Sequence, residues 1–354
     1  MANIIPLLFK LYTILNRKLT FHKYIDLNTL ENSYYLYEAH KLGVSSNIIM
    51  DNVLQLTNRN EVYNIWRSGT DLDGLGSLHV SGDKVYCYSM FEKSNIPTPN
   101  HMVLKSGDYK NAIVFKKRIK SPVVIKPARD TGDSKGVFVR PETLSEIYWA
   151  VNCAGAYGKE IIVEEYFRGT NYRLLFCKGQ FLGASARVPA SIVCDGAHSI
   201  NELIILSNRG RRRIGDILPY ETVSRPILYE IKITRQVKKV IGRQGLRLIS
   251  VGAKGDLVQL HETCHWLYGG QYFDVTDEIS PVLVDACRKS VEAIGIKLAG
   301  VDLIAQDIKD PKRGTYVINE INTTPALLIH YEVQNQEKRR DVARMILESM
   351  FHLK

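Results

Sequence analysis

The chain has few cysteines and no cysteine motif. Six cysteines are scattered along its 354 residues, and no two of them form a CxxC pair. Their spacing excludes a zinc ribbon and a disulfide framework and is typical of a reducing cytoplasm. The sequence also has no apolar run that approaches the roughly 20 residues needed to cross a bilayer. We therefore expect a cytoplasmic protein of ordinary globular composition, long enough for two or three domains.

The sequence also lacks the common signatures of nucleotide and nucleic-acid binding. It contains neither the GxxxxGK[ST] of a Walker A loop nor the GxGxxG of a dinucleotide-binding fold. Helix-turn-helix, zinc-finger and RNP signatures are missing as well, so we expect no nucleic-acid partner. The formal net charge is nevertheless +10. This excess of positive charge suits a protein that binds an anionic substrate. The alternative explanation is that the charge only forms a basic, solvated surface.

What the chain does have is a strand, a lysine, a glycine loop and a second strand between residues 121 and 173. β-Branched residues at 123–125 lead into Lys126. Gly132 and Gly136 bound a loop and permit backbone angles that turn amides toward an anion. The second strand, at 161–163, delivers two glutamates beside aromatic rings. Together these groups could hold a nucleotide, with the cation and amides on phosphates and the rings around adenine.

Here the sequence resembles the ATP-grasp superfamily, and within it the ATP-grasp part of cyanophycin synthetase and related glutathione-synthetase-like ligases. The matching segments, in family order, are SGDK (81–84), VVIKP (123–127), the loop ending Gly136-Val137, VEEYFRGTNYRLL (163–175), SARVPASIVCDGAHSINELI (185–204), GGQYFDVTDE (269–278), AGVDLI (299–304) and INEINTTP (318–325). The resemblance implies an α/β (α+β) chain with the ATP-grasp fold, which clasps ATP between two sheets. It further implies an N-terminal α/β domain at 1–80, a lid subdomain at 81–166 and a catalytic subdomain at 167–354.

The resemblance implies a role for each matching residue. The implied ATP-binding set is Lys84, Lys126, Gly132, Gly136, Val137, Glu164, Glu165, Phe167 and Asn171. The lysines and loop amides would contact the phosphates, and the hinge at 164–167 would meet the adenine. Asn171 stands where relatives place an acidic or polar residue on the ribose hydroxyls, and it can bond a diol without a charge.

Two apolar strands expected at 301–304 and 316–322 carry oxygen ligands. Strand alternation places Glu320 and Asn322 on one face, with Asp302 on a neighbouring strand. Hard oxygen ligands of this kind suit one or two magnesium ions, or manganese. For any one acidic residue on a strand, the alternative is that it forms a salt bridge at the rim of the sheet and binds no metal.

The chemistry implied by the resemblance is that of an ADP-forming carboxylate–amine ligase. A substrate carboxylate attacks the γ-phosphorus, and an amine then displaces phosphate from the acyl phosphate. The expected catalytic residues are Arg187, Lys126 and Asn322, with Arg187 offsetting charge on the transferring group. Arg173 is equally consistent with pairing to a local acid. The substrates would be amino acids or peptides of acidic character, and similar enzymes are commonly homodimers.

Two other functions stay open at this stage. An ATP-grasp nucleotide site also serves kinases, so a phosphotransferase is one alternative. A non-catalytic nucleotide-binding regulatory protein is the other, with the basic amphipathic segment 1–25 on a membrane, although such a segment more often packs on its own domain. The metal-ligand set argues against this last function, because a binding module need not keep it.

One segment matches a different enzyme class. Residues 261–265, HETCH, match the HExxH signature of zinc proteases. The lead-in 256–260 alternates like a strand and Gly269-Gly270 follow closely, so the helix that a zinc protease needs is not expected. Cyanophycin synthetases carry paired arginines and an asparagine here. This departure argues against polymerisation of aspartate and arginine by this chain.

Several local structures are also predicted. Ser81 is the expected N-cap of a helix that begins at Lys84. A closing amphipathic helix is expected at 334–354, and the basic run 209–213 is expected to be a solvated loop or an attractor of acidic substrate. Within the lid, strands are predicted at 112–116, 123–126 and 136–139, and a helix at 141–151.

Overall fold

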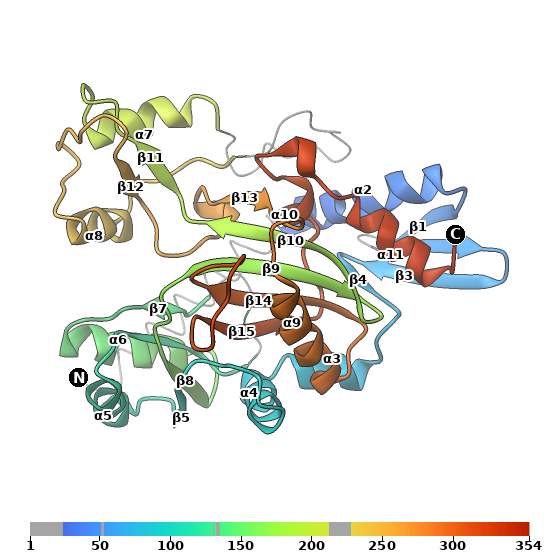
Figure 1. Cartoon of the computed structure of the whole chain (residues 1–354), viewed down its shortest axis with the longest axis horizontal. Helices are drawn as coiled ribbons and strands as arrows, with labels where there is room; N and C mark the ends of the chain where they lie inside the picture. Colours follow the sequence, from blue (N-terminus) through green and yellow to red (C-terminus); the bar gives the residue numbers. More distant parts are fainter. Residues whose placement is uncertain (1–23, 51–52, 130, 132–134, 212–227, 354) are drawn as a thin grey trace.

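The computed structural model describes residues 24–50, 53–129, 131, 135–211 and 228–353. Within these residues the strands form four sheets, and neighbouring strands are antiparallel in every sheet. Figure 1 shows the largest sheet at the centre, with the other elements around it. This arrangement agrees with the expected α+β class. Gly132, most of the predicted N-terminal helix and the end of the basic run lie outside the described residues.

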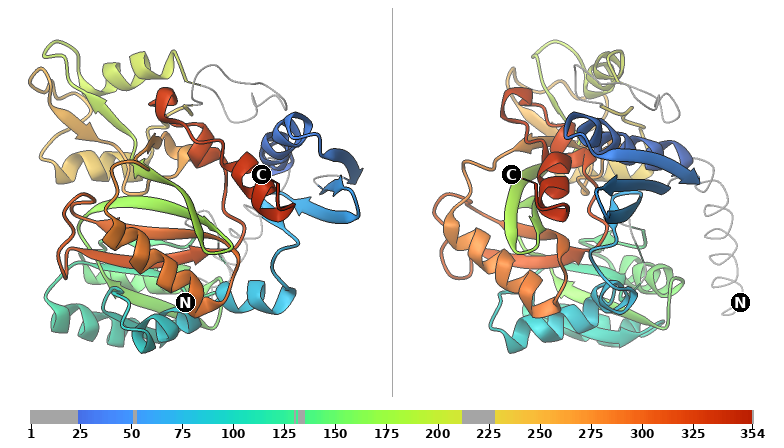
Figure 2. Two further views of the ribbon diagram at one scale, coloured as in Figure 1. Left: turned by 45° about the vertical axis from the view of Figure 1, so that its right-hand side comes forward. Right: turned by 90° about the vertical axis from the view of Figure 1, so that its right-hand side faces the viewer.

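The N-terminal unit is a helix followed by a four-stranded meander. Its elements are α2 (Tyr24–Lys41), β1 (Ser45–Met50), β2 (Val53–Asn58), β3 (Glu61–Trp66) and β4 (Gly69–Thr70). Leu54 and Ile65 of the sheet share a hydrophobic cluster with Tyr35 of α2. The same cluster includes Val342 and Ile346 of the C-terminal helix α11 (Val342–Met350). The two ends of the described chain therefore pack together (Figure 2).

Two helices connect this unit to the lid. They are α3 (Leu75–Ser81) and α4 (Lys84–Lys93). Asp83 caps α4, because its carboxylate accepts hydrogen bonds from the amides of Val85 and Tyr86. The prediction that Ser81 is the N-cap is wrong: Ser81 ends α3, and its hydroxyl donates to the carbonyl of Ser77.

The lid is a four-stranded sheet covered by two helices. Its elements are β5 (His101–Lys105), α5 (Tyr109–Ile119), β6 (Val123–Pro127), β7 (Phe138–Val139), α6 (Leu144–Gly155) and β8 (Glu160–Glu165), with strand order β5-β8-β6-β7. The predicted strand at 112–116 is wrong, because these residues lie within α5. Ala112 and Phe115 are buried one helical turn apart, against Ile147 of α6.

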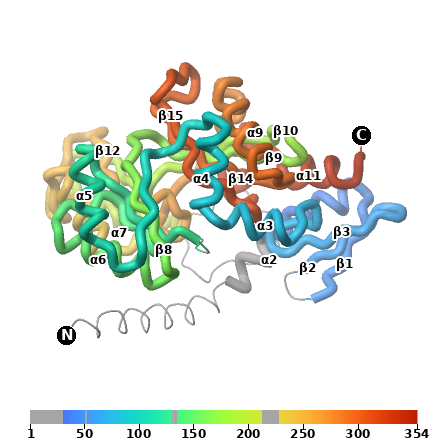
Figure 3. Tube along the Cα trace, turned by 90° about the horizontal axis from the view of Figure 1, so that it is seen from below, coloured from blue at the N-terminus to red at the C-terminus, as the bar shows by residue number. Residues whose placement is uncertain are grey.

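The central sheet has five strands in the order β13-β10-β9-β14-β15. Its strands are β9 (Thr170–Cys177), β10 (Gln180–Val188), β13 (Gln271–Asp274), β14 (Leu298–Ala305) and β15 (Tyr316–Asn322). Helix α9 (Pro281–Ile294) packs beside α4 (Figure 3). Phe91 of α4, Leu283 of α9 and Leu174 of β9 belong to one buried cluster. Helix α4 thus fixes its first residue, Lys84, against the central sheet.

A smaller unit is inserted between β10 and β13. It contains β11 (Ser191–Val193), α7 (Ile200–Asn208), α8 (Arg235–Arg243) and β12 (Leu257–Gln259), with a hydrophobic cluster of its own. In Figure 1 this insertion and the lid lie on the same side of the molecule. The chain then passes through η1 (Trp266–Tyr268) to the central sheet.

The chain closes with short helical elements. They are α10 (Leu328–Tyr331), η2 (Gln336–Lys338) and α11. The expected single helix at 334–354 is therefore shorter than predicted and begins at Val342. None of the helices in the described part of the chain has the length and apolarity required to cross a bilayer.

Candidate active site

One cleft of about 470 Å³ brings together side chains from the lid, the central sheet and the N-terminal unit. The predicted site residues that line it are Lys84, Lys126, Val137, Glu164, Glu165, Phe167, Asn171, Arg187, Asp302, Glu320 and Asn322. These residues come from segments far apart in the sequence. The tertiary structure therefore gathers them at one place.

Lys84 is a buried cation at the first position of α4. Its backbone amide donates to the carbonyl of Ala128, with 3.2 Å between the nitrogen and oxygen, which ties the start of α4 to the end of β6. Its Nζ lies 3.0 Å from Oε1 of Glu320. A predicted phosphate ligand and a predicted metal ligand are therefore already in contact.

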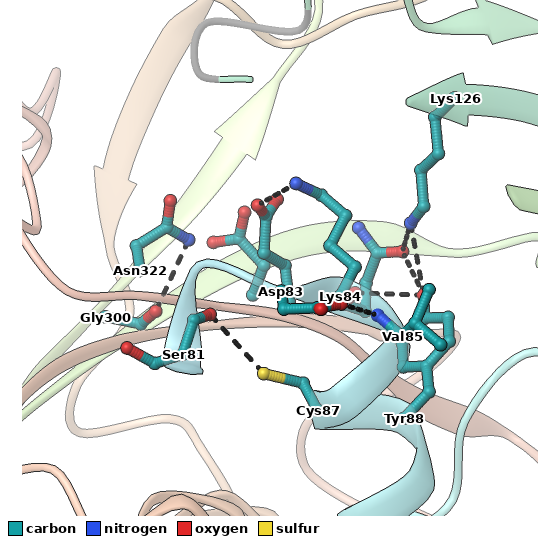
Figure 4. A network of polar contacts seen from close by, with 12 residues as sticks. Ser81, Asp83, Lys84, Val85, Cys87, Tyr88, Lys126, Gly300 and Asn322 are labelled. Atoms are coloured by element: carbon teal, nitrogen blue, oxygen red, sulfur yellow. Dashed lines mark hydrogen bonds and ion pairs between the residues drawn. The ribbon is translucent and has the colours of Figure 1, made fainter. Parts of the chain in front are cut away.

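Lys126 is a second buried cation, at the end of β6. Its Nζ lies 2.8 Å from Oε2 of Glu164 and 3.1 Å from both Oη of Tyr88 and Oδ1 of Asn319. Figure 4 shows Lys84 and Lys126 reaching into this region from two separate elements. Burial, together with Glu164, raises the pKa of Tyr88 well above its usual value, so its hydroxyl donates to that carboxylate. Sequence reasoning missed Tyr88 and Asn319, because neither carries a recognisable motif role.

The hinge residues follow β8. The amides of Glu165 and Tyr166 are already bonded, to the carbonyls of Asn100 and Pro122 at 2.8 Å each. The carboxylate of Glu165 accepts a hydrogen bond from the side chain of Asn100. The hinge therefore presents the ring of Phe167 to the cleft, together with the carboxylate of Glu164, which forms an ion pair with Lys126.

Gly136 occupies a position that excludes a side chain. Its φ is +72°, and a Cβ there would lie 2.8 Å from Cγ of Pro127 and from Cε2 of Tyr157. The next residue, Val137, lines the cleft. The expected glycine requirement at 136 is thus explained by backbone angle and close packing together.

Asp302 lies between two arginines of the central sheet. Arg173 donates to both of its carboxylate oxygens, and Nη1 of Arg187 lies 2.9 Å from Oδ2. Burial opposes ionisation of Asp302, but the two guanidinium groups lower its pKa below the usual range. In return, Asp302 outweighs the effect of burial on Arg187 and raises the pKa of that guanidinium.

The oxygen ligands on β15 face the cleft as strand alternation predicts. Asp302 pairs directly with Glu320 across the β14–β15 ladder, and Asn322 pairs with Gly300. The side-chain nitrogen Nδ2 of Asn322 donates to the carbonyl of Gly300, at 3.4 Å, and Asn322 lines the cleft. Among the described residues there is no cluster of three or more His, Cys, Asp or Glu side chains that could hold a metal. The oxygen donors nevertheless fit magnesium by their chemistry, since Asn322 supplies a carbonyl oxygen.

Comparison with known proteins gives relatives that include cyanophycin synthetases and glutathione biosynthesis bifunctional proteins. The chain is 28% identical over 293 residues to the cyanophycin synthetase of Crocosphaera subtropica, a match that covers 80% of this chain and 32% of that protein. It is 27% identical over 347 residues to a glutathione biosynthesis bifunctional protein of Clostridium perfringens, covering 95% of this chain and 43% of the other. The chain therefore spans about a third of the length of the cyanophycin synthetase. No protein-family model matches.

The crystal structure of a bifunctional glutathione synthetase from Pasteurella multocida superposes on 92% of this chain and 44% of that chain, with a TM-score of 0.64 and 24% sequence identity. The fold predicted from the eight matching segments is thus confirmed. The chain has the ATP-grasp fold and is similar in sequence to ligases of that fold. Within this ATP-grasp chain, the cleft lies where the lid and the central sheet face each other.

The HETCH segment of this ATP-grasp chain is not a zinc site. His265 precedes the single turn η1 and its Nδ1 accepts from the amide of Leu267, while the ring of His261 stacks on Tyr268 at 4.5 Å. The two histidines are therefore not on one face of a helix, as HExxH chemistry requires. Glu262 is instead buried against two arginines, which sequence reasoning did not foresee.

The described part of the basic run has a structural contact. Nη1 of Arg211 donates to the carbonyls of Tyr229 and Gly269, and its Nε donates to the hydroxyl of Ser207. Burial lowers the pKa of Arg211. This arginine thus holds α7 to the turn before β13 instead of lying in a solvated loop.

Proposed function

We propose that this chain is an ATP- and magnesium-dependent carboxylate–amine ligase, which forms an amide bond through an acyl phosphate and releases ADP and phosphate. The observation that carries the proposal is that two buried lysines, from α4 and β6, reach the same strand β15, Lys84 at the oxygen ligand Glu320 and Lys126 at the neighbouring Asn319. Both cations lie in a cleft that the aromatic rings of Tyr166 and Phe167 also line. Binding of a nucleoside triphosphate with its metal ion needs cations, oxygen ligands and apolar walls together.

We propose a role for each of the expected site residues. Lys84, Lys126 and the backbone at Gly136 and Val137 would contact phosphates, and Asn171 would bond the ribose. Glu164, Glu165 and Phe167 would surround the adenine. The predicted Gly132 would complete the loop. Because Lys126 already pairs with Glu164, the lysine also orients that carboxylate.

Magnesium would be held by Glu320, Asn322 and Asp302. Bound there, it supplies charge that offsets the phosphate oxygens, as one or two ions, with manganese as a substitute. Asp302 can join the set when it exchanges one of its arginine hydrogen bonds for the ion. Arg187 would then be available to neutralise the transferring phosphoryl group.

The substrates proposed are amino acids or peptides of acidic character, joined in the cytoplasm by a homodimeric enzyme. Relatives named for cyanophycin and glutathione synthesis support an amino-acid or peptide substrate class. The positive net charge supports the acidic character. We also propose that residues 1–80, 81–166 and 167–354 are the domains, with the lid excluding water from the acyl phosphate.

The test is ADP release with magnesium and hydroxylamine, across pools of amino acids and short acidic peptides. Hydroxylamine intercepts an acyl phosphate as a hydroxamate. We expect a hydroxamate with at least one pool, its loss in Glu320→Gln, and its retention in Glu292→Gln, a matched change on the exposed face of α9. ADP with a phosphorylated product would instead indicate a kinase. Nucleotide binding without turnover would indicate a regulatory protein.

A further inference from the structure

The N-terminal unit, which carries no recognisable motif, reaches the cleft through the turn between β3 and β4. Arg67 and Ser68 of this turn line the cleft together with Thr324. A Cβ on Gly69 would lie 2.8 Å from Cγ2 of Thr324, so the turn packs directly on the loop after β15. Thr324 is two residues beyond Asn322. The β3–β4 turn therefore forms the part of the cleft wall that lies next to the oxygen ligands of β15.

Arg67 is held in a defined position within this turn. Its φ is +59°, a left-handed conformation that residues other than glycine adopt infrequently. The pairing of Trp66 with Gly69 closes the turn, and Oη of Tyr35 lies 3.4 Å from the carbonyl oxygen of Ser68. The guanidinium carbon lies 4.6 Å from the ring centroid of Trp66. The side chain is thus supported by an aromatic face beneath it.

Arg67 differs from the other arginines that line the cleft in whether a described acid pairs with it. Arg173 and Arg187 share the carboxylate of Asp302. Arg67 makes no ion pair with any described residue, and its Nε is buried without a hydrogen-bond partner among them. Glu31, on the same wall, directs its carboxylate to the amides of Leu327 and Leu328. A buried donor that lacks a partner is costly, and a ligand can satisfy it.

We propose that Arg67 binds a carboxylate of the amino-acid or peptide substrate and so determines substrate specificity. This inference rests on the proposed ligase function and assigns one part of its substrate site. The planar fork of a guanidinium matches a carboxylate with two parallel hydrogen bonds. A phosphate dianion would need further cations, and the two other arginines that line the cleft, Arg173 and Arg187, are held by Asp302. A carboxylate therefore fits Arg67 better, since among the described arginines that line the cleft it is the one without an acid partner.

The test is the thermal stability of the full chain with magnesium and a non-hydrolysable ATP analogue. The probes are the twenty amino acids and dipeptides of aspartate and glutamate, each as the free acid and as the carboxamide. We expect at least one free acid to raise the melting temperature, and its carboxamide to bind about tenfold more weakly or worse. Arg67→Gln should lose this preference, and Arg67→Lys should keep part of it because the charge remains.

Arg59→Gln is the matched control. Arg59 lies in the neighbouring β2–β3 turn of the same sheet, also with a left-handed φ of +52°, but it is exposed and does not line the cleft. The Arg59→Gln variant should bind the probes as the unmodified chain does. Equal binding by Arg67→Gln and the unmodified chain, or no response of the unmodified chain to any free acid, would overturn the proposal. The ATP analogue alone should raise the melting temperature, and Lys126→Met should lose this rise. These two measurements test the proposed ligase function separately.

Discussion

Arg140 of the lid and Glu262 of the HETCH segment form a buried ion pair, with 2.6 Å between Nη2 and Oε1. Arg243 of α8 donates to the same carboxylate oxygen at 2.7 Å and to the carbonyl of Arg140 at 2.6 Å. The side chain of Glu262 is 4% exposed. A single carboxylate therefore links the lid to the insertion beside the cleft, and this contact is what the glutamate of HETCH provides.

Glu262→Gln should destabilise the protein and weaken nucleotide binding. The change leaves two guanidinium groups beside a neutral amide, and removing one partner of a buried ion pair costs about 3 kcal/mol or more. We expect this loss in urea unfolding and a raised KM for ATP, because the lid is less firmly held. Glu142→Gln is the control, since Glu142 pairs with the same Arg243 but is 61% exposed. Equal effects of the two changes would contradict the assignment.

Asp302→Asn should raise the magnesium concentration needed for half-maximal ADP release by about tenfold, if the carboxylate is a metal ligand. Glu320→Gln should have at least the same effect. The measurement is a magnesium titration at saturating ATP. A fall in turnover with an unchanged magnesium requirement would show that Asp302 acts by holding Arg173 and Arg187 instead.

His330→Leu should stabilise the protein more at pH 5 than at pH 7. His330 is fully buried, neither ring nitrogen has a partner among the described residues, and burial lowers its pKa from 6.5 to about 3. Between these values the unfolded chain binds a proton that the folded chain does not, so stability falls as the pH falls. The advantage of the variant should grow by about 2 kcal/mol from pH 7 to pH 5, at about 1.4 kcal/mol per pH unit. Urea unfolding at both pH values measures this, and a constant difference would contradict the burial argument.

Glu31→Gln should show the opposite trend. Burial raises the pKa of Glu31 from 4.5 to about 7, despite hydrogen bonds from two backbone amides. The folded chain therefore holds a proton that the unfolded chain has lost, and this contribution to stability is complete below pH 4.5 and is lost as the pH rises toward 7. Relative to the unmodified chain, the variant should gain about 2 kcal/mol between pH 5 and pH 7. The same unfolding series tests this, and parallel curves for the two proteins would refute it.

Local sequence pattern predicted much of the lid and the central sheet. The strands around 123–126 and 161–163 are present as β6 and β8, and β14 and β15 contain the two that carry the oxygen ligands. Alternation along β15 is sufficient to place Glu320 and Asn322 on one face, because successive side chains of a strand point to opposite sides. The apolar run at 112–116 was misassigned as a strand because a short apolar stretch fits a strand and a buried helix face equally well.

By itself, the sequence determined the fold, where along the chain the strands that carry the site lie, and the residue types available for phosphate and metal. These features depend on neighbours along the chain and on motifs in a fixed order. Only the tertiary structure decided which partners those residues have: Tyr88 on Lys126, Glu262 on Arg140, and no acid on Arg67 among the described residues at the wall of the cleft. The physical reason is that burial and pairing of a charge depend on segments brought together by folding, and no local pattern encodes the distance between them.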